Sequence, residues 1–97
     1  MAAYIIVDVK IHDPERYEEY KSLARPMVER FGGEYLVRGA PIDLVDEELW
    51  SPTRIVLLRF PDHAAARAFI DSDEYAPVKQ MRHDFADSTL FIVEGED

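Results

Sequence analysis

The sequence predicts an α+β fold in which one four-stranded antiparallel sheet carries its helices on a single face. Strand-like and helical patterns follow one another in the order strand, long helix, strand, strand, helical stretch, strand. The whole pattern occupies 97 residues, so residues 1–97 are expected to form one domain. The strands also carry apolar side chains on both faces, which leaves one face of the sheet without cover inside the chain.

The first half of the pattern is a strand followed by a long helix. Residues Ala3–Ile11 are rich in β-branched side chains and predict the first strand. Asp13 and Pro14 suit the N-cap and first position of a helix, and Gly32-Gly33 ends it. The expected buried stripe of this helix consists of Tyr17, Tyr20, Ala24, Met27, Val28 and Phe31.

The next two strands are joined by a long connection. Glu34–Arg38 predicts the second strand, and Ile42–Val45 is a candidate extension of it beyond a Gly-Ala-Pro interruption. Asp46–Thr53 reads as a loop that holds the single tryptophan, Trp50. Arg54–Phe60 predicts the third strand.

The remainder predicts two helical segments and a last strand. Asp62 is the expected cap of a short helix, and Asp71-Ser72-Asp73 separates it from a second helical segment over Tyr75–Phe85. Thr89–Val93 predicts the fourth strand. The resulting βαββαβ order is the ferredoxin-like pattern, with strand order 4-1-3-2 and right-handed crossovers that place the helices together.

The uncovered sheet face predicts self-association. A bare four-stranded apolar face would be larger than the apolar patches that soluble monomers usually expose. Two such faces packed together would bury on the order of 1,600 Å², which is typical of a stable complex. We therefore expect a homodimer through the open sheet face, with Asp8, Arg59 and also Arg38 lining or rimming an interior cavity.

Composition narrows the classes of partner. The net charge of -9 comes from 20 acidic and 11 basic residues without a basic cluster, which argues against nucleic acid and against anionic membrane surfaces. There is no cysteine, so disulfides, thiolate metal sites and a cysteine nucleophile are excluded. The N-terminus lacks the features of a signal peptide, and no apolar run approaches the ~20 residues of a membrane span. These features predict a cytoplasmic protein.

Nearly the whole chain resembles one family. The matching residues are Asp13-Pro14-Glu15 with Tyr17 and Tyr20, Phe31-Gly32-Gly33-Glu34-Tyr35-Leu36-Val37-Arg38-Gly39, Glu47, Trp50, Pro52, Arg54, Phe60-Pro61, Ala65-Ala66, Ser72-Asp73-Glu74-Tyr75, Arg82 and Val93-Glu94-Gly95. On these residues the chain is similar to the family catalogued as domain of unknown function 1330, within the dimeric α+β barrel superfamily. The resemblance implies the fold and a dimer, and no established reaction.

Five residues are candidates for binding a ligand. The guanidinium groups of Arg38, Arg54 and Arg82 suit a carboxylate or phosphate, and Trp50 and Tyr75 would stand beside them. Three alternatives remain open. The arginines could form salt bridges that pin the loop, with Asp46, Glu47 and Glu74 as partners. Trp50 could plug the barrel end or anchor the dimer, and Tyr75, like Tyr17, could simply pack in the core.

Asp8 and His83 are the candidates for moving a proton. Asp8 would be a base if it faced an apolar cavity, because desolvation raises the pKa of a carboxyl group. The alternative is an ion pair with Arg59 on the adjacent strand. His83 is the one histidine expected near the cleft, and no two histidines have the spacing of metal ligands, so we expect neither a metal nor a cofactor.

Two functions follow from these patterns. The first is a small-molecule binder or cofactor-independent enzyme that acts on a small acidic organic molecule. The second is a non-catalytic dimeric module with a filled interior. Haem chemistry would need an inward-facing axial histidine, which the pattern does not provide.

Overall fold

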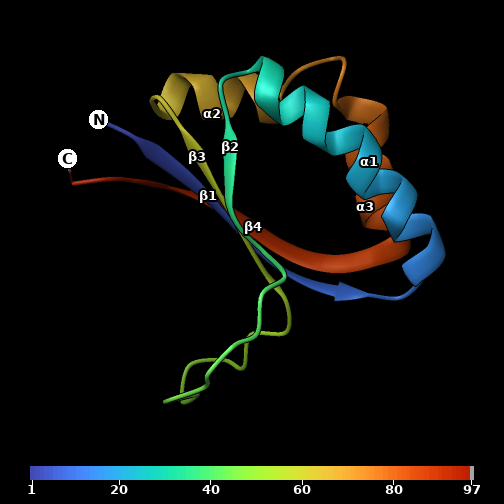
Figure 1. Cartoon of the computed structure of the whole chain (residues 1–97), viewed down its shortest axis with the longest axis vertical. Helices are drawn as coiled ribbons and strands as arrows, with labels where there is room; N and C mark the ends of the chain where they lie inside the picture. The colour runs from blue at the N-terminus through green and yellow to red at the C-terminus, as the bar shows by residue number, and fades with distance from the viewer. Residues whose placement is uncertain (97) are drawn as a thin grey trace.

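The computed structural model describes residues 1–96. Its elements follow the expected order, with one strand, one long helix, two strands, two helices and a last strand (Figure 1). Their bounds are β1 Ala3–Ile11, α1 Pro14–Arg30, β2 Glu34–Arg38, β3 Ile55–Phe60, α2 His63–Ile70, α3 Ala76–Phe85 and β4 Ala86–Glu94.

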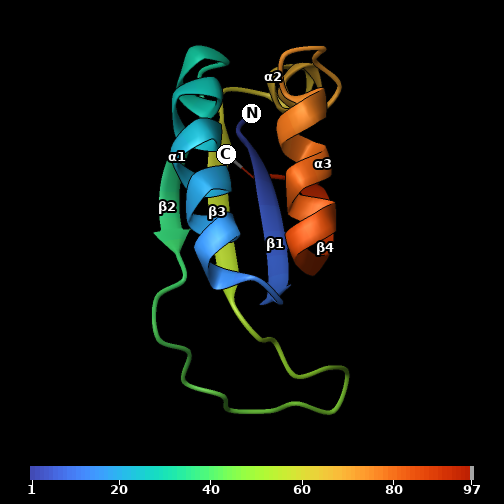
Figure 2. The same ribbon diagram turned by 90° about the vertical axis from the view of Figure 1, so that its right-hand side faces the viewer.

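The four strands form one antiparallel sheet in the order β2-β3-β1-β4. This is the predicted order 4-1-3-2 read from the other edge, so the predicted ferredoxin-like fold is confirmed. The helices lie together on one face of the sheet, with α1 and α3 running side by side across it (Figure 2).

Both helix starts that the sequence predicted are capped by aspartate side chains. A carboxylate oxygen of Asp13 accepts a hydrogen bond from the Arg16 backbone N–H at 3.2 Å. Asp62 accepts one from the Ala65 N–H at 2.8 Å. These bonds satisfy backbone donors that the first helical turn leaves free.

The predicted extension of the second strand over Ile42–Val45 is wrong, because residues 39–54 leave the sheet as an irregular loop. Gly39 has a φ of +72°, which turns the chain away from β3, and Pro41 lacks the N–H that a strand ladder needs. The loop projects beyond the body of the molecule (Figures 1 and 2). Within it Val45 is 85% exposed and Leu49 87% exposed, so apolar side chains lie at the loop's surface.

The hydrophobic core lies between the helices and the sheet. Side chains alternate along β1, so that Ile5 and Val9 are buried under the helices while Tyr4 and Ile6 point to the opposite face. Phe60 at the end of β3 is fully buried and its ring stacks near that of Phe69 in α2, with centroids 5.7 Å apart. Each such burial contributes roughly 1.5–3 kcal/mol of hydrophobic stabilisation.

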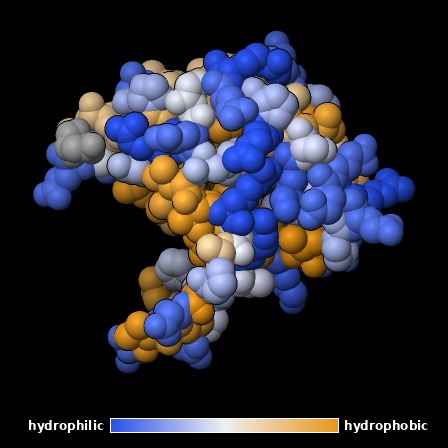
Figure 3. Space-filling view, viewed as in Figure 1, coloured by the Kyte–Doolittle hydropathy of each residue, from blue (hydrophilic) through white to orange (hydrophobic). Residues whose placement is uncertain are grey.

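The opposite sheet face is open and apolar along its middle. Val37, Leu57, Ile6 and Phe91 form one cross-strand row over all four strands. Phe91 is 37% exposed, and within residues 1–96 no helix covers this face, because the helices all lie on the other side of the sheet (Figure 1). Hydrophobic residues line the hollow between the body and the projecting loop (Figure 3).

Within residues 1–96, none of the helices combines the length and the apolar character that a membrane-spanning segment requires.

Candidate functional site

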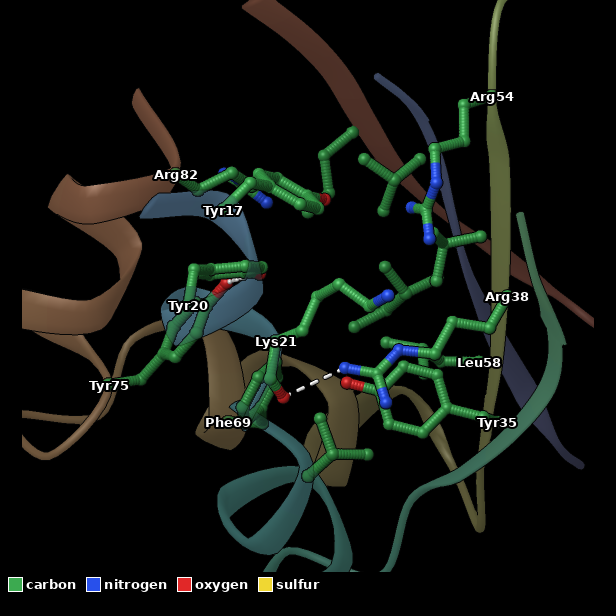
Figure 4. A pocket seen from close by; sticks show the side chains of 15 residues that line it. Tyr17, Tyr20, Lys21, Tyr35, Arg38, Arg54, Leu58, Phe69, Tyr75 and Arg82 are labelled. Atoms are coloured by element: carbon green, nitrogen blue, oxygen red, sulfur yellow. Dashed lines mark hydrogen bonds between the residues drawn. The ribbon is translucent and has the colours of Figure 1, made fainter. Parts of the chain in front are cut away.

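A narrow cavity opens between the helices and the sheet, near the end of the sheet from which the loop leaves. Its empty volume is about 440 Å³, but the centre of a water-sized molecule can occupy only about 30 Å³ of it. One water needs roughly 10–15 Å³ of such space. The cavity therefore suits a small molecule. Its polar lining consists of Tyr17, Tyr20, Lys21, Tyr35, Arg38, Arg54, Tyr75 and Arg82 (Figure 4).

Three of the four lining cations are the arginines that the sequence singled out. Arg54 precedes β3, Arg38 ends β2, and Arg82 reaches the cavity from α3 on the opposite side (Figure 4). The fold therefore brings together Arg38, Arg54, Arg82 and Tyr75, as expected, although whether they bind a ligand stays a prediction.

The expected place of Arg38 on the open sheet face is wrong, and a β-bulge is the reason. The register of β2 against β3 shifts between Tyr35 and Val37. Because of the shift, Tyr35 and Arg38 both point to the helix side although three positions separate them. Regular alternation along the strand would have put them on opposite faces.

Aromatic rings and one backbone carbonyl hold the two sheet-side arginines. Arg38 Nη2 donates to the Lys21 carbonyl oxygen at 2.8 Å, and its guanidinium carbon lies 4.2 Å from the Tyr35 ring centroid. The guanidinium carbon of Arg54 lies 5.6 Å from the ring centroid of Tyr17. These contacts orient the arginines without neutralising their charge.

No carboxylate neutralises these arginines within residues 1–96. The cavity lining contains no Asp, Glu or His, and none of the ion pairs of the described chain includes Arg38, Arg54 or Arg82. Glu74, one of the partners considered from the sequence, pairs with Arg30 instead. The salt-bridge alternative is therefore wrong for Glu74, and the cavity keeps a concentrated positive charge in a chain of net charge -9.

Arg82 is the most constrained of the three. It is only 5% exposed, and its Nε atom has no hydrogen-bond partner among the described residues. A buried donor without a partner destabilises the fold by roughly 1–3 kcal/mol. An oxygen-rich anion bound in the cavity would supply the missing acceptor.

Four tyrosines complete the polar lining. The hydroxyl groups of Tyr20 and Tyr75 lie 2.8 Å apart and share a hydrogen bond, and the rings of Tyr17 and Tyr20 are 5.1 Å apart. Burial raises the pKa of Tyr17, Tyr35 and Tyr75, although nearby arginines oppose the shift. Burial, and then the neighbouring Tyr75, raise the pKa of Tyr20 well above its usual value. The phenols therefore stay neutral and keep their O–H groups, of which Tyr20 and Tyr75 use one for the bond between them.

Because these pKa values are raised, stability should fall in alkali. Above pH 10 the unfolded tyrosines lose protons that the folded protein keeps, so unfolding becomes more favourable as pH rises. Between pH 9 and 11 we expect a downward slope of the unfolding free energy that Tyr20→Phe makes shallower. Urea unfolding at fixed protein concentration would measure it, with pH 7 as the reference. An unchanged slope in the variant would contradict the buried state of this phenol.

Trp50, Asp8 and His83 do not line the cavity. Asp8 lies on the open sheet face, where its carboxylate accepts hydrogen bonds from the Trp50 indole and from two backbone N–H groups. His83 is exposed on the outer side of α3, beside a shallow surface groove. The expected nearness of His83 to the cleft is wrong, because the turn of α3 that buries Arg82 directs the next residue outward.

The alternative ion pair between Asp8 and Arg59 is also wrong. Asp8 stands opposite Ile55, whereas Arg59 stands opposite Tyr4, four residues along β1. Arg59 lies closer to Glu34 across the sheet, with 3.8 Å between Nη1 and the carboxylate oxygen.

Sequence reasoning missed Lys21, Tyr20 and Tyr35 as cavity residues. Tyr20 was part of the predicted buried stripe, and its spacing of three from Tyr17 was the available signal. Tyr35 sits beside the bulge, which no local pattern marks. The ammonium of Lys21 pairs with Glu18 at 3.2 Å, so this cation is partly neutralised.

Residues 2–96 match the profile of the family described as domain of unknown function, DUF1330. The chain belongs to the DUF1330 family. No curated protein matches it at a significant level.

Solved structures similar to this DUF1330 chain share its fold at low sequence identity. RPA0582 from Rhodopseudomonas palustris, of unknown function, superposes with a TM-score of 0.75 at 19% identity, covering 99% of this chain and 83% of that one. A dimeric ferredoxin-like protein of unknown function from Jannaschia sp. CCS1 gives 0.74 at 16%, covering 98% and 100%. SnoaB from Streptomyces nogalater, a cofactor-independent oxygenase, gives 0.71 at 13%, covering 99% and 94%.

Proposed function

We propose that this chain binds a small organic acid in the cavity between helices and sheet, as a binding protein or as a cofactor-independent enzyme acting on that acid. The observation that carries the proposal is the set of three converging arginines without a carboxylate partner in the described chain. Guanidinium groups bind carboxylates through paired, charge-assisted hydrogen bonds. A bound acid would neutralise the buried charge.

The other cavity walls support the same class of ligand. Phe69, Leu58 and Val7 form an apolar surface that suits a short hydrocarbon skeleton, and the phenols can donate to a second oxygen. The small space favours a molecule of few heavy atoms. A short acid with a carbonyl or enol oxygen near its carboxylate combines these properties.

If the protein is an enzyme, its cavity is suited to stabilising negative charge. Arginines and neutral tyrosines can donate hydrogen bonds. The described lining contains no Asp, Glu or His that could accept a proton. Such a donor set favours reactions in which an enolate oxygen develops negative charge. SnoaB is described as a cofactor-independent oxygenase, so this fold is compatible with an activity that needs no cofactor.

The proposed assembly is a homodimer through the open sheet face. The apolar row of Val37, Leu57, Ile6 and Phe91 needs a cover that the described chain does not provide, and an identical row on a second copy is self-complementary about a two-fold axis. The Jannaschia relative is described as dimeric, which supports this arrangement.

Titration with three matched compounds tests the ligand class. We expect acetoacetate to bind most tightly, butyrate less tightly and neutral butyramide not at all, as measured by NMR chemical-shift titration. Arg54→Ala should weaken acetoacetate binding by about tenfold to 100-fold, which the titration can still measure, while the oligomeric mass stays unchanged. Equal binding of butyrate and butyramide would contradict a charge-based site. Loss of the oligomer in Arg54→Ala would make this arginine structural.

The second candidate is a non-catalytic dimeric module, which the narrowness of the cavity favours. In that case none of the three compounds would shift any cavity resonance, and a panel of other small acids would leave the melting temperature unchanged.

A further inference from the structure

The carboxylate of Asp8, on the open sheet face, accepts three hydrogen bonds from the loop that precedes β3. One oxygen accepts from the backbone N–H of Thr53 at 2.8 Å and from that of Arg54 at 3.1 Å. The other oxygen accepts from the indole Nε1 of Trp50 at 3.0 Å. A single side chain of β1 therefore holds three donors from the last residues of the long loop.

We propose that Asp8 is a positioning residue that holds Arg54 in the cavity from the opposite face of the sheet. The inference rests on the proposed function, because it assigns Arg54 its role in binding the acid. It gives Asp8 a task other than proton transfer.

Both backbone polar groups of Arg54, its C=O and its N–H, are hydrogen-bonded to residues of β1. Its carbonyl oxygen accepts from the Val9 N–H at 2.9 Å, and its own N–H donates to Asp8. The carboxylate thus extends the antiparallel ladder by one residue beyond the start of β3. With its backbone fixed in this way, Arg54 continues the alternation of side chains along β3. Its side chain therefore points to the helix side, as those of Val56 and Leu58 do.

A second contact fixes the guanidinium itself. A Cβ atom added to Gly39 would lie 2.6 Å from Nε and 2.7 Å from Nη2 of Arg54. The arginine therefore packs directly on the bare backbone of Gly39, whose positive φ already favours glycine. Asp8 holds the backbone of Arg54, and Gly39 restricts the position of its guanidinium group. Contacts from both ends of the loop therefore fix the same arginine.

The hydrogen bond from Trp50 to Asp8 can be followed by NMR spectroscopy. It is the single tryptophan of the chain, so its indole N–H gives one unambiguous NMR signal. In Asp8→Asn the amide oxygen can still accept from Thr53 and Arg54, but its NH₂ group cannot accept from the indole. In Asp8→Ala both carboxylate oxygens, and with them all three hydrogen bonds, are lost.

The first experiment needs no ligand and records proton–nitrogen spectra of the folded protein. We expect Asp8→Asn to shift the Trp50 indole signal and leave the Arg54 Nε signal in place. Asp8→Ala should move or broaden both signals while the Arg38 Nε signal is unchanged. An unchanged Arg54 signal in Asp8→Ala would overturn the proposal. If Asp8→Ala does not fold, Asp8→Val, which also lacks an acceptor and favours strand structure, is read by the same criteria.

The second experiment is a double-mutant cycle with acetoacetate as the probe. Asp8→Ala should weaken its binding at least fivefold in the wild-type and Arg38→Ala backgrounds, but have no further effect in the Arg54→Ala background. An equal effect in all three backgrounds would mean that Asp8 acts only on general stability and would overturn the inference. Should the wild type not bind acetoacetate, the proposed function fails for this probe, whereas the ligand-free spectra still decide the role of Asp8.

Discussion

Leu57→Asp is expected to convert the protein into a monomer of 11.2 kDa. Leu57 lies in the middle of the apolar row on the open face, between Ile6 and Val37. In a dimer two aspartates would meet in an apolar interface, and an unpaired buried charge destabilises by roughly 3–5 kcal/mol. At 1.4 kcal/mol per factor of ten, the dimer would weaken at least 100-fold. Sedimentation equilibrium at micromolar concentration measures the mass.

Leu23→Asp is the matched control for this variant. It makes the same chemical change on α1, where Leu23 is 40% exposed on the helical layer. We expect this variant to keep the mass of the wild type. A wild type that sediments at 11.2 kDa, or a Leu57→Asp variant that remains dimeric, would show that the open face is not the interface.

Arg82→Met should stabilise the protein and at the same time remove its affinity for acids. Methionine has a similar length and no charge. The variant therefore removes both the Nε donor that has no partner and the unpaired positive charge next to the buried tyrosines. We expect the free energy of unfolding to rise by about 1–3 kcal/mol in urea titrations. Acetoacetate binding should fall below detection.

Arg38→Met serves as the comparison for Arg82→Met. Arg38 is less buried, and its guanidinium donates to a backbone carbonyl, so its replacement should bring no comparable gain in stability. A loss of stability in Arg82→Met would mean that Arg82 holds the helices and sheet together through its contacts. The cavity would then have a structural role that the proposed function does not include.

Much of the fold could be predicted because it depends on local patterns. Asp13 and Asp62 were identified as helix caps from their place before helical segments, and their carboxylates do accept the first free N–H groups. Alternation along β1 correctly separated the helix-facing Ile5 from the open-facing Ile6. The start of β4 was placed at Thr89, three residues late, because Ala86 has a low strand propensity and is recruited by its pairing with Ile11.

The site was predicted in part. Arg54, Arg82 and Tyr75 were expected to meet, since they come from segments that the βαββαβ topology brings together, and they do line one cavity. Trp50 was expected beside them but bonds to Asp8 on the other face of the sheet. The path of the sixteen-residue loop (39–54) depends on contacts with residues distant in the sequence, such as Asp8. Local sequence patterns do not predict such contacts.

The sequence by itself determined the order of elements, the apolar character of the open sheet face and the excess of negative charge, because these follow from residue type and period. Only the tertiary structure decided which face Arg38 serves and which donors the carboxylate of Asp8 binds. A one-residue bulge in β2 reverses the side of a strand to which a side chain points, and the carboxylate of Asp8 finds its partners 42 to 46 positions away. Both depend on pairing between distant strands, where a shift of one residue exchanges the two faces.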